Sequence, residues 1–288
     1  MIRLGINVPN FGPETDMQVL SEWAQFAETG GFAAMVVSDH VAPTAEVTAL
    51  YPDPFYDPLT LIAWLAGRTE RLLFATSVLV VPYRNPLLTA RISAMLHEMS
   101  RGRFALGVGV GWSPSEFAVV GGDFAARGAT TDRYLEVITE AWRSELVTSG
   151  GAQVATGPRP DGGHVPLWIG GAAAPAIRRV VRFGSAWHPI NPDRGWLREK
   201  GIPALRDEAE RAGSPVPQIV PRIKFRVTGS AGADRALGVG TLAQIADDVR
   251  ELFDLGASLV IVDPNPDSPV PRDFAAERDG LAELLAAL

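Results

Sequence analysis

A regular alternation of short apolar runs and longer amphipathic segments constrains the fold of this chain more than any other feature. Several of the runs are continuously apolar, as strands that are buried on both faces should be. Eight strands are predicted, at residues 2–8, 34–38, 72–78, 104–110, 167–169, 185–187, 219–227 and 258–262. Apolar strands that are separated by helices are typical of a parallel sheet.

The longer segments have the periodicity and the end signals of helices. Asp57 before Pro58, and Asn85 before Pro86, each combine a capping side chain with a proline at the first helical position. Eight helices are predicted, at residues 16–29, 57–67, 85–100, 131–148, 175–183, 193–212, 241–255 and 274–288. Eight strand–helix units in 288 residues predict an α/β fold, a single (β/α)8 TIM barrel domain that spans residues 1–288.

Composition narrows the class of protein further. The chain is 47% hydrophobic and 20% charged, which excludes an intrinsically disordered chain. A net charge of −7 opposes unaided binding to nucleic acid. The sequence has no apolar run of the roughly 20 residues that a membrane span needs, and its start lacks the pattern of a signal peptide. With no cysteine and four scattered histidines, we expect a cytoplasmic protein that acts on a small molecule without a metal.

Two segments break the rhythm of strand and helix. Residues 51–57 follow the second strand and are rich in proline, aspartate and aromatic residues. Loops that follow strands form the catalytic face of a barrel, so this segment is expected to shape a pocket. Residues 149–165 are rich in glycine and proline but follow a helix, so we expect a surface excursion away from that face.

Asp39 and His40 stand at the end of the second predicted strand, and therefore at the catalytic face. A carboxylate beside an imidazole can exchange a proton near neutral pH. The same pair can also anchor a loop, with the aspartate capping a turn. The position at the C-terminal end of a strand favours a catalytic role for both residues.

Gly107, Gly109 and Gly111 alternate at the end of the fourth predicted strand, just before Trp112. Alternate glycines remove the side chains from one face of a strand, so that a flat ligand could approach the backbone. Close packing between strands explains the pattern equally well. The spacing differs from the G-x-G-x-x-G fingerprint of dinucleotide-binding proteins.

A second glycine segment, Ile169-Gly170-Gly171-Ala172, links the fifth predicted strand to a helix. Free backbone N–H groups at a helix start suit a phosphate, although an ordinary glycine turn has the same sequence. Trp187 closes the sixth strand, where an aromatic ring could wall a flat ligand or simply pack in the core.

Arg222, Lys224 and Arg226 alternate along the seventh predicted strand. Lys224 could in principle form a Schiff base with a carbonyl substrate, as in barrel aldolases. The flanking arginines favour a charge-paired barrel interior or an anion site instead.

Taken in order, these segments resemble the luciferase-like (bacterial luciferase-type) oxidoreductases, in the subgroup that depends on the deazaflavin coenzyme F-420. The matching pieces are Ser38-Asp39-His40, Thr76-Ser77-Val78-Leu79 with Pro82, Arg84 and Pro86, the run LHEMSRGRFALGVGVGWSPSEF, Arg127-Gly128, Trp168-Ile169-Gly170-Gly171 and Gly184-Ser185-Ala186-Trp187. Each piece is short, but their order and spacing are specific.

The resemblance implies a barrel with a tricyclic ring in its mouth and a cis peptide bond at Ser77–Val78 beneath that ring. Asp39 would contact the ring, and His40 would face the substrate and exchange a proton with it. The implied reaction is hydride transfer between the deazaflavin C5 carbon and a small organic substrate. The residues expected to bind the cofactor are Asp39, Thr76, Ser77, Val78, Gly109, Gly111, Trp112, Ile169, Gly170, Gly171, Ala172 and Trp187.

One departure from the family concerns the substrate. The sugar-phosphate dehydrogenases of this family carry a glutamate directly after the glycine run, where this chain has Trp112. The chain also lacks a lysine cluster suited to a sugar phosphate. A hydrophobic or aromatic substrate is suggested by the aromatic residues Tyr51, Phe55, Tyr56, Trp112 and Trp187, although these rings could also wall the cofactor or pack in the core.

Two other functions stay open. One is an FMN-dependent monooxygenase of the same family that uses molecular oxygen, and the other is a non-catalytic barrel that binds a flavin or deazaflavin. The apolar helices at residues 57–67 and 85–100 also suggest a homodimer, although burial within one chain explains the same residues.

Overall fold

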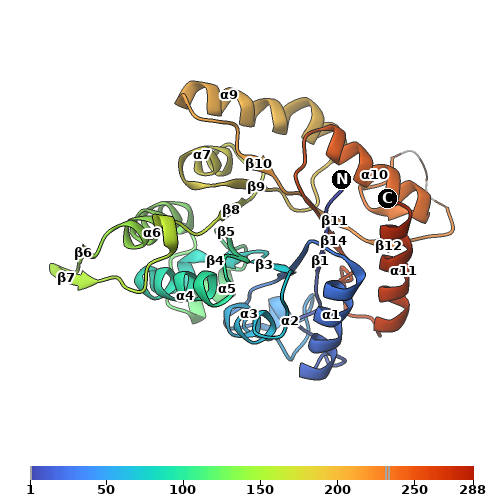
Figure 1. Cartoon of the computed structure of the whole chain (residues 1–288), viewed down its shortest axis with the longest axis horizontal. Helices are drawn as coiled ribbons and strands as arrows, with labels where there is room; N and C mark the ends of the chain where they lie inside the picture. The colour runs from blue at the N-terminus through green and yellow to red at the C-terminus, as the bar shows by residue number, and fades with distance from the viewer. Residues whose placement is uncertain (1, 231, 233) are drawn as a thin grey trace.

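A parallel sheet that curls into a barrel forms the centre of the molecule (Figure 1). The computed structural model describes residues 2–230, 232 and 234–288. Neighbouring strands follow the order β10-β9-β8-β5-β3-β2-β1-β14-β11. These strands are β1 (Leu4–Asn7), β2 (Ala34–Val37), β3 (Leu73–Thr76), β5 (Phe104–Gly109), β8 (Leu167–Gly170), β9 (Ala186–His188), β10 (Gln218–Ile219), β11 (Arg222–Lys224) and β14 (Val260–Asp263).

The two ends of this path, β10 and β11, belong to one strand that is interrupted at Pro221. The backbone N–H of Val220 donates to the carbonyl of Trp187 in β9 at 2.8 Å. On the other side, the N–H of Ile261 in β14 donates to the carbonyl of Pro221 at 2.9 Å. The interrupted strand therefore bonds to a neighbour on each side, and the ring of strands closes as the predicted TIM barrel requires.

Helices surround the sheet on its outer face (Figure 1). The predicted caps are present: the Asp57 carboxylate accepts the Thr60 N–H at 2.9 Å, and the Asn85 side chain accepts the Leu87 N–H at 2.9 Å. The helices are α1 (Met17–Gly30), α2 (Ala45–Thr48), α3 (Pro58–Ala66), α4 (Pro86–Met99), α5 (Pro114–Val119), α6 (Arg127–Arg143), α7 (Ala174–Phe183), α8 (Arg194–Trp196), α9 (Ile202–Ala212), α10 (Leu242–Asp254) and α11 (Phe274–Ala286). None of the helices that the structure describes has the length and apolar character needed to cross a membrane.

Smaller elements complete the chain. They are β4 (Leu79–Val80), β6 (Leu146–Ser149), β7 (Ala152–Ala155), β12 (Arg226–Val227), β13 (Val239–Gly240), η1 (Val81–Tyr83), η2 (Asp161–Gly163) and η3 (Leu197–Gly201). The last of these is a π-helical turn that interrupts the helix predicted at residues 193–212.

The hydrophobic core has two parts. The larger part lies between the strands and the surrounding helices. The smaller part is drawn from the strands and their immediate neighbours, so it fills the inside of the barrel; four of its members are alanines, and Trp168 is its bulkiest member. Small side chains leave room for one large ring, and this plug forms the floor beneath the mouth of the barrel.

The prediction for residues 131–148 is wrong at both ends. Helix α6 already begins at Arg127, and it stops at Arg143 because Ser144 adopts an extended conformation. Strands β6 and β7 then form an antiparallel hairpin whose tip, Gly150-Gly151, has positive φ angles of 57° and 79°. Glycine adopts such a tip readily. The hairpin at residues 146–155 overlaps the excursion predicted at residues 149–165, and it projects from the side of the barrel (Figure 1).

Gly107 offers a test of how tightly β3 and β5 approach each other. A Cβ atom at this position would collide with the carbonyl oxygen of Thr76, which belongs to the backbone of β3. We expect Gly107→Ala to lower the free energy of unfolding by about 2 kcal/mol, as overpacking of a core does. Urea unfolding measures this change. Gly229→Ala is the matched control, since a Cβ there meets no atom within 4 Å; equal stabilities of the two variants would contradict the packing described.

Candidate active site

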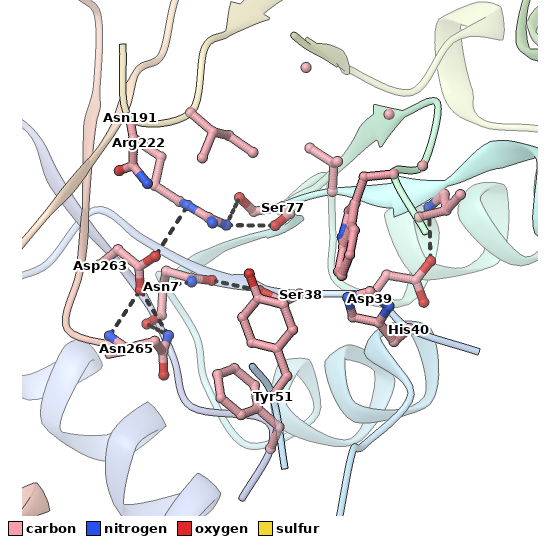
Figure 2. Close-up of a pocket in the computed structure, with 18 of the residues that line it drawn as sticks. Asn7, Ser38, Asp39, His40, Tyr51, Ser77, Asn191, Arg222, Asp263 and Asn265 are labelled. Atoms are coloured by element: carbon pink, nitrogen blue, oxygen red, sulfur yellow. Dashed lines mark hydrogen bonds and ion pairs between the residues drawn. The ribbon is translucent and has the colours of Figure 1, made fainter. Parts of the chain in front are cut away.

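A cavity of about 390 Å³ opens at the C-terminal ends of the strands. Figure 2 shows its polar lining, with Asn7, Asp263 and Asn265 on one side and Asp39 and His40 on the other. The lining residues are Asn7, Phe11, Ser38, Asp39, His40, Tyr51, Phe55, Ser77, Val78, Val80, Gly109, Val110, Gly111, Trp112, Gly170, Gly171, Ile190, Asn191, Arg222, Asp263, Asn265, Pro266 and Asp267. The loop at residues 51–57 contributes to this pocket, as predicted.

His40 is held by a buried carboxylate. Its Nδ1 lies 2.7 Å from Oε2 of Glu116, whose side chain is fully buried. Oε1 of Glu116 accepts the backbone N–H groups of Val41 at 2.7 Å and Ala42 at 3.0 Å. With Nδ1 bonded to Glu116, the ring nitrogen left to exchange a proton with a ligand is Nε2, which has no hydrogen-bond partner among the described residues.

The environment of Glu116 keeps it charged. Burial alone would raise the pKa of this carboxyl group, but the hydrogen bonds from His40 and from the backbone of Ala42 and Val41 outweigh burial and lower it. An ionised carboxylate fixes both the orientation of the imidazole and the identity of the nitrogen that faces the pocket.

Aromatic rings enclose His40 on several sides. Tyr51 stacks on the imidazole with a centroid distance of 5.4 Å, and Phe55 and Trp112 contact it edge-on at 5.2 and 5.7 Å. Burial raises the pKa of the Tyr51 phenol, so its hydroxyl carries a proton at neutral pH. In Figure 2 the Tyr51 ring lies near the centre of the cavity. Its hydroxyl has no partner within the described part of the chain, so it is free to bond to a ligand.

Asp39 has a different environment from the one expected for a catalytic acid. Both of its carboxylate oxygens accept hydrogen bonds from Arg84, at 2.6 and 2.7 Å, and one also accepts the Val80 N–H at 2.8 Å. Burial raises the pKa of this carboxyl group, and the Arg84 guanidinium opposes that effect. The geometry therefore favours a bracing role for Asp39, which ties β2 to β4 and η1.

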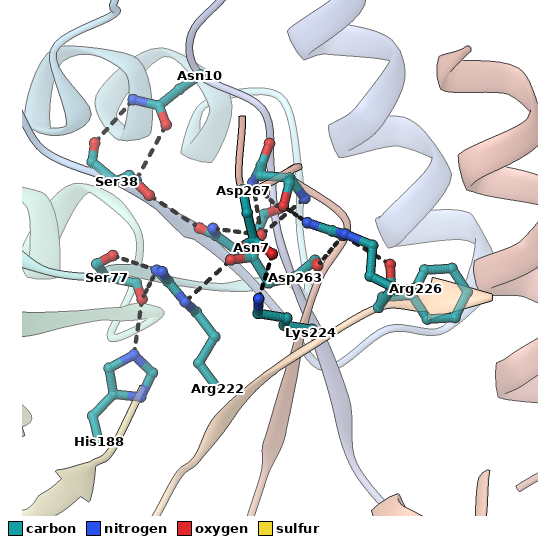
Figure 3. Close-up of polar contacts among 12 residues, drawn as sticks. Asn7, Asn10, Ser38, Ser77, His188, Arg222, Lys224, Arg226, Asp263 and Asp267 are labelled. Carbon is teal, nitrogen blue, oxygen red and sulfur yellow. Dashed lines mark hydrogen bonds and ion pairs between the residues drawn. The ribbon is translucent and has the colours of Figure 1, made fainter. Parts of the chain in front are cut away.

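Ser77 directly follows β3, and the Ser77–Val78 peptide is cis, as the resemblance implies. Figure 3 shows how His188 and Arg222 reach this serine. Burial lowers the pKa of His188 to about 3, so its ring is neutral; Nδ1 donates to the Val220 carbonyl and Nε2 accepts from Ser77 Oγ at 2.8 Å. Arg222 donates to Ser77 Oγ and to its carbonyl, at 2.9 and 2.7 Å.

Packing within the protein requires glycine at two of the alternating positions, Gly109 and Gly111. A Cβ at Gly109 would lie 2.6 Å from Val78, and one at Gly111 would lie 2.7 Å from Val80. Gly111 also has a φ angle of 82°, which favours glycine. Close approach of β4 to β5 therefore explains these residues. Gly109, Gly111, Gly170 and Gly171 nevertheless line one common cavity, where their main chain is bare.

Four of the residues expected to bind the cofactor lie outside the described lining of the cavity: Thr76, Ile169, Ala172 and Trp187. Thr76 is buried and donates to the Gly107 carbonyl. Ile169 belongs to the core between sheet and helices. Trp187 is fully buried against Trp196, and its indole N–H donates to the Gly171 carbonyl at 2.8 Å. Trp187 therefore packs in the core, which was the alternative to a role as a wall for a flat ligand. Its bond to Gly171 supports the glycine turn.

Glu116 is the main residue that the sequence reasoning missed. Ser113 and Glu116 match the sequence pattern of a capping box, and the Ser113 hydroxyl does accept the Glu116 N–H at 3.2 Å. The glutamate side chain instead turns toward the loop after β2. A carboxylate three residues beyond the helix cap Ser113, and five residues after Gly111, was the available signal.

The chain belongs to the luciferase-like monooxygenase family, whose model matches residues 3–236. It is 30% identical over 250 residues to an F420-dependent glucose-6-phosphate dehydrogenase of Nakamurella multipartita. The matched region covers 82% of this chain and 70% of that protein. Two solved structures share the fold at a TM-score of 0.78: monooxygenase RslO1 from Streptomyces bottropensis (21% identical; 99% of each chain covered) and an F420-dependent secondary alcohol dehydrogenase (18% identical; 99% and 98% covered). The family inferred from the sequence is confirmed.

Because the pKa of Glu116 is lowered, we expect its contribution to the free energy of unfolding to depend on pH. Because the pKa in the folded state lies below the unfolded value of about 4.3, ionised Glu116 contributes stability above that pH, and the contribution is lost as the pH falls through the folded value. Glu116→Gln should cost about 2 kcal/mol at pH 7, and the difference from wild type should shrink below pH 4. Urea unfolding across pH 3–7 measures it. A difference that is constant across this range would show that the charge of Glu116 does not matter.

Proposed function

We propose that this protein is a coenzyme F-420-dependent oxidoreductase that transfers a hydride between the deazaflavin and an uncharged alcohol or carbonyl substrate. The observation that carries the proposal is the His40–Glu116 pair, which presents an imidazole nitrogen to a cavity walled by bare main chain. The relative named an F420-dependent dehydrogenase supports the choice of cofactor.

The walls of the cavity suit a flat ring. Val78, Gly109 and Gly170 form one side of it, where the two glycines expose main chain and the Val78 side chain packs against both of them. These residues, together with Gly111, Gly171 and Trp112, would hold the deazaflavin. When bound, the deazaflavin supplies a carbon that accepts or gives a hydride, and it leaves the accompanying proton to the protein.

The chain's own residues then divide the remaining work. His40 exchanges the proton with the substrate oxygen at Nε2, and Glu116 orients its ring. The Tyr51 hydroxyl donates a hydrogen bond to the same oxygen. The rings of Phe55 and Trp112 keep water away from the imidazole, and Asp39 with Arg84 braces the loop that carries it. Positioning of the two reactants supplies much of the rate.

The charges around the cavity favour an uncharged substrate. Arg222, in the cavity wall, has its Nε 3.4 Å from the Asp263 carboxylate, and Lys224 pairs with Asp267. Both of these cations therefore have a carboxylate partner, with which the phosphate of a sugar phosphate would have to compete. Together with Trp112 in place of glutamate, this pairing argues against the substrate of the named relative. The salt bridge of Lys224 also argues against an imine-forming role for it.

An FMN-dependent monooxygenase is the second candidate, since a monooxygenase shares the fold. Titration of the purified protein with F-420 and with FMN, at matched concentrations, separates the two. We expect F-420 to bind at least tenfold more tightly, with the change in its fluorescence as the measurement. Tighter binding of FMN would replace the proposal with the monooxygenase. If neither cofactor binds, both enzyme proposals and the non-catalytic binding barrel are wrong.

The His40 side chain provides the mechanistic test. Because a positioned general acid or base contributes about 10²–10⁴-fold to a rate, His40→Ala should lower kcat at least 100-fold while the Kd for F-420 changes less than threefold. Turnover is followed by deazaflavin absorbance with the best uncharged alcohol of a panel. His164→Ala, at an exposed histidine, is the control. An unchanged kcat would remove His40 from the mechanism.

Two further expectations from the sequence stay predictions. The first is a cytoplasmic location. The second is a homodimer through α3 and α4, for which Leu88, Met95 and Met99 on α4 offer exposed apolar surface.

A further inference from the structure

A second, apolar cavity of about 270 Å³ lies beside the main one. Three loops at the mouth of the barrel build it: the loop after β1, the segment that joins α2 to α3, and the loop after β14. Its apolar walls come chiefly from Leu50, Pro52, Pro269, Val270 and Pro271. We call this cavity the annex.

The annex adjoins the candidate active site. Phe11 and Pro266 line both cavities, so they form the boundary between them. The ring of Phe11 stacks on Phe55 at a centroid distance of 5.5 Å, and Phe55 in turn contacts His40 at 5.2 Å. A row of two packed aromatic rings therefore links the imidazole to the wall of the annex.

The surface of the annex is unusual for a region that faces water. Val270 is 51% exposed and Leu50 is 38% exposed, although both are large apolar side chains. Covering such surface with an apolar group is worth roughly 25 cal/mol per Å². Clustered apolar residues beside a catalytic pocket typically mark a binding groove.

The charges at the annex favour an uncharged occupant. Arg272 is paired with Glu277 at 2.6 Å and also bonds to the Asn265 side chain. Glu14 lies at the edge with a carboxylate that would repel an anion. The annex therefore offers apolar contact and no free cation among the described residues.

Volume supplies the last argument. An apolar cavity of about 150 Å³ is enough to hold benzene. A tricyclic cofactor would therefore take up much of the 390 Å³ main cavity, leaving room only for the reactive end of a substrate. The annex, at 270 Å³, has room for a further ring or a short alkyl chain.

We propose that the annex binds the remote apolar end of an extended, uncharged substrate whose alcohol or carbonyl group reaches His40. This proposal rests on the proposed function, because it takes His40 as the reacting end of the site. It assigns to Phe11 the position between the two halves of the bound substrate.

Paired probes test the proposal by binding, without the need for turnover. Benzyl alcohol and 4-phenylbenzyl alcohol differ by one phenyl ring, and both are titrated into the F-420-loaded protein by calorimetry. We expect the longer probe to bind at least tenfold more tightly. Its analogue with a carboxylate on the distal ring should lose that advantage, because Glu14 faces it. Equal affinities for the two alcohols, or no detectable binding of the longer one, would overturn the proposal.

Variants locate the effect in the annex. Val270→Asp and Leu50→Asp change different loops of the annex, and each should reduce the affinity for the longer probe at least fivefold while changing that for benzyl alcohol less than twofold. Val216→Asp is the matched control, since Val216 is also 51% exposed but precedes β10 at the other end of the barrel. Thermal melting verifies that each variant is folded. Wild-type affinity for the longer probe in both annex variants would contradict the assignment.

The two proposals fail in different ways. If F-420 does not bind but the longer probe still binds the unloaded protein through Val270 and Leu50, the proposed function is wrong and the annex stands. If F-420 binds and the probes show no dependence on these residues, the annex is wrong and the proposed function stands.

Discussion

The carboxylate of Glu116 accepts four hydrogen bonds in the mouth of the barrel, from His40, from the N–H groups of Val41 and Ala42, and from the hydroxyl of Tyr83. A buried charge is costly unless such donors surround it. Because these donors come from the loop after β2 and from η1, one anion holds together the segments that build the site. The imidazole is thereby fixed with one nitrogen toward the protein and the other toward the ligand.

On the opposite side of the cavity, hydrogen bonds also fix the side chains, but the central group is a neutral imidazole and not an ionised carboxylate. His188 is neutral because it is buried, so its Nε2 accepts a hydrogen bond from the Ser77 hydroxyl. The serine oxygen in turn accepts a hydrogen bond from Arg222. Asp263, which accepts hydrogen bonds from the side chains of Asn7 and Asn265, lies beside the arginine (Figure 3). Arg222 and Asp263 in the cavity wall are therefore paired with each other. We infer that the aromatic rings of the lining select the ligand.

The sequence predicted the barrel well because its signals are local. Apolar runs, Asp57-Pro58 and Asn85-Pro86 are signals between neighbouring residues. The helix predicted at residues 131–148 nevertheless ends at Arg143, and a hairpin follows it. The site was predictable only in part. Strand ends placed Asp39, His40, Gly109 and Gly170 at one mouth, but Glu116 is separated from His40 by 76 residues, and local pattern carries no information about such a contact. Trp187 also closes a strand at the mouth, and the sequence could not show that its side chain faces the core and not the cavity.

We propose that the His40–Glu116 pair and the glycine wall face one planar cofactor across a single cavity. A crystal structure of the protein with F-420 tests it most directly. The account predicts the tricyclic ring against Val78, Gly109 and Gly170, with Nε2 of His40 facing the open side where a substrate would lie. A ring bound outside this cavity, or a His40 that has turned away from Glu116 to bind elsewhere, would contradict it.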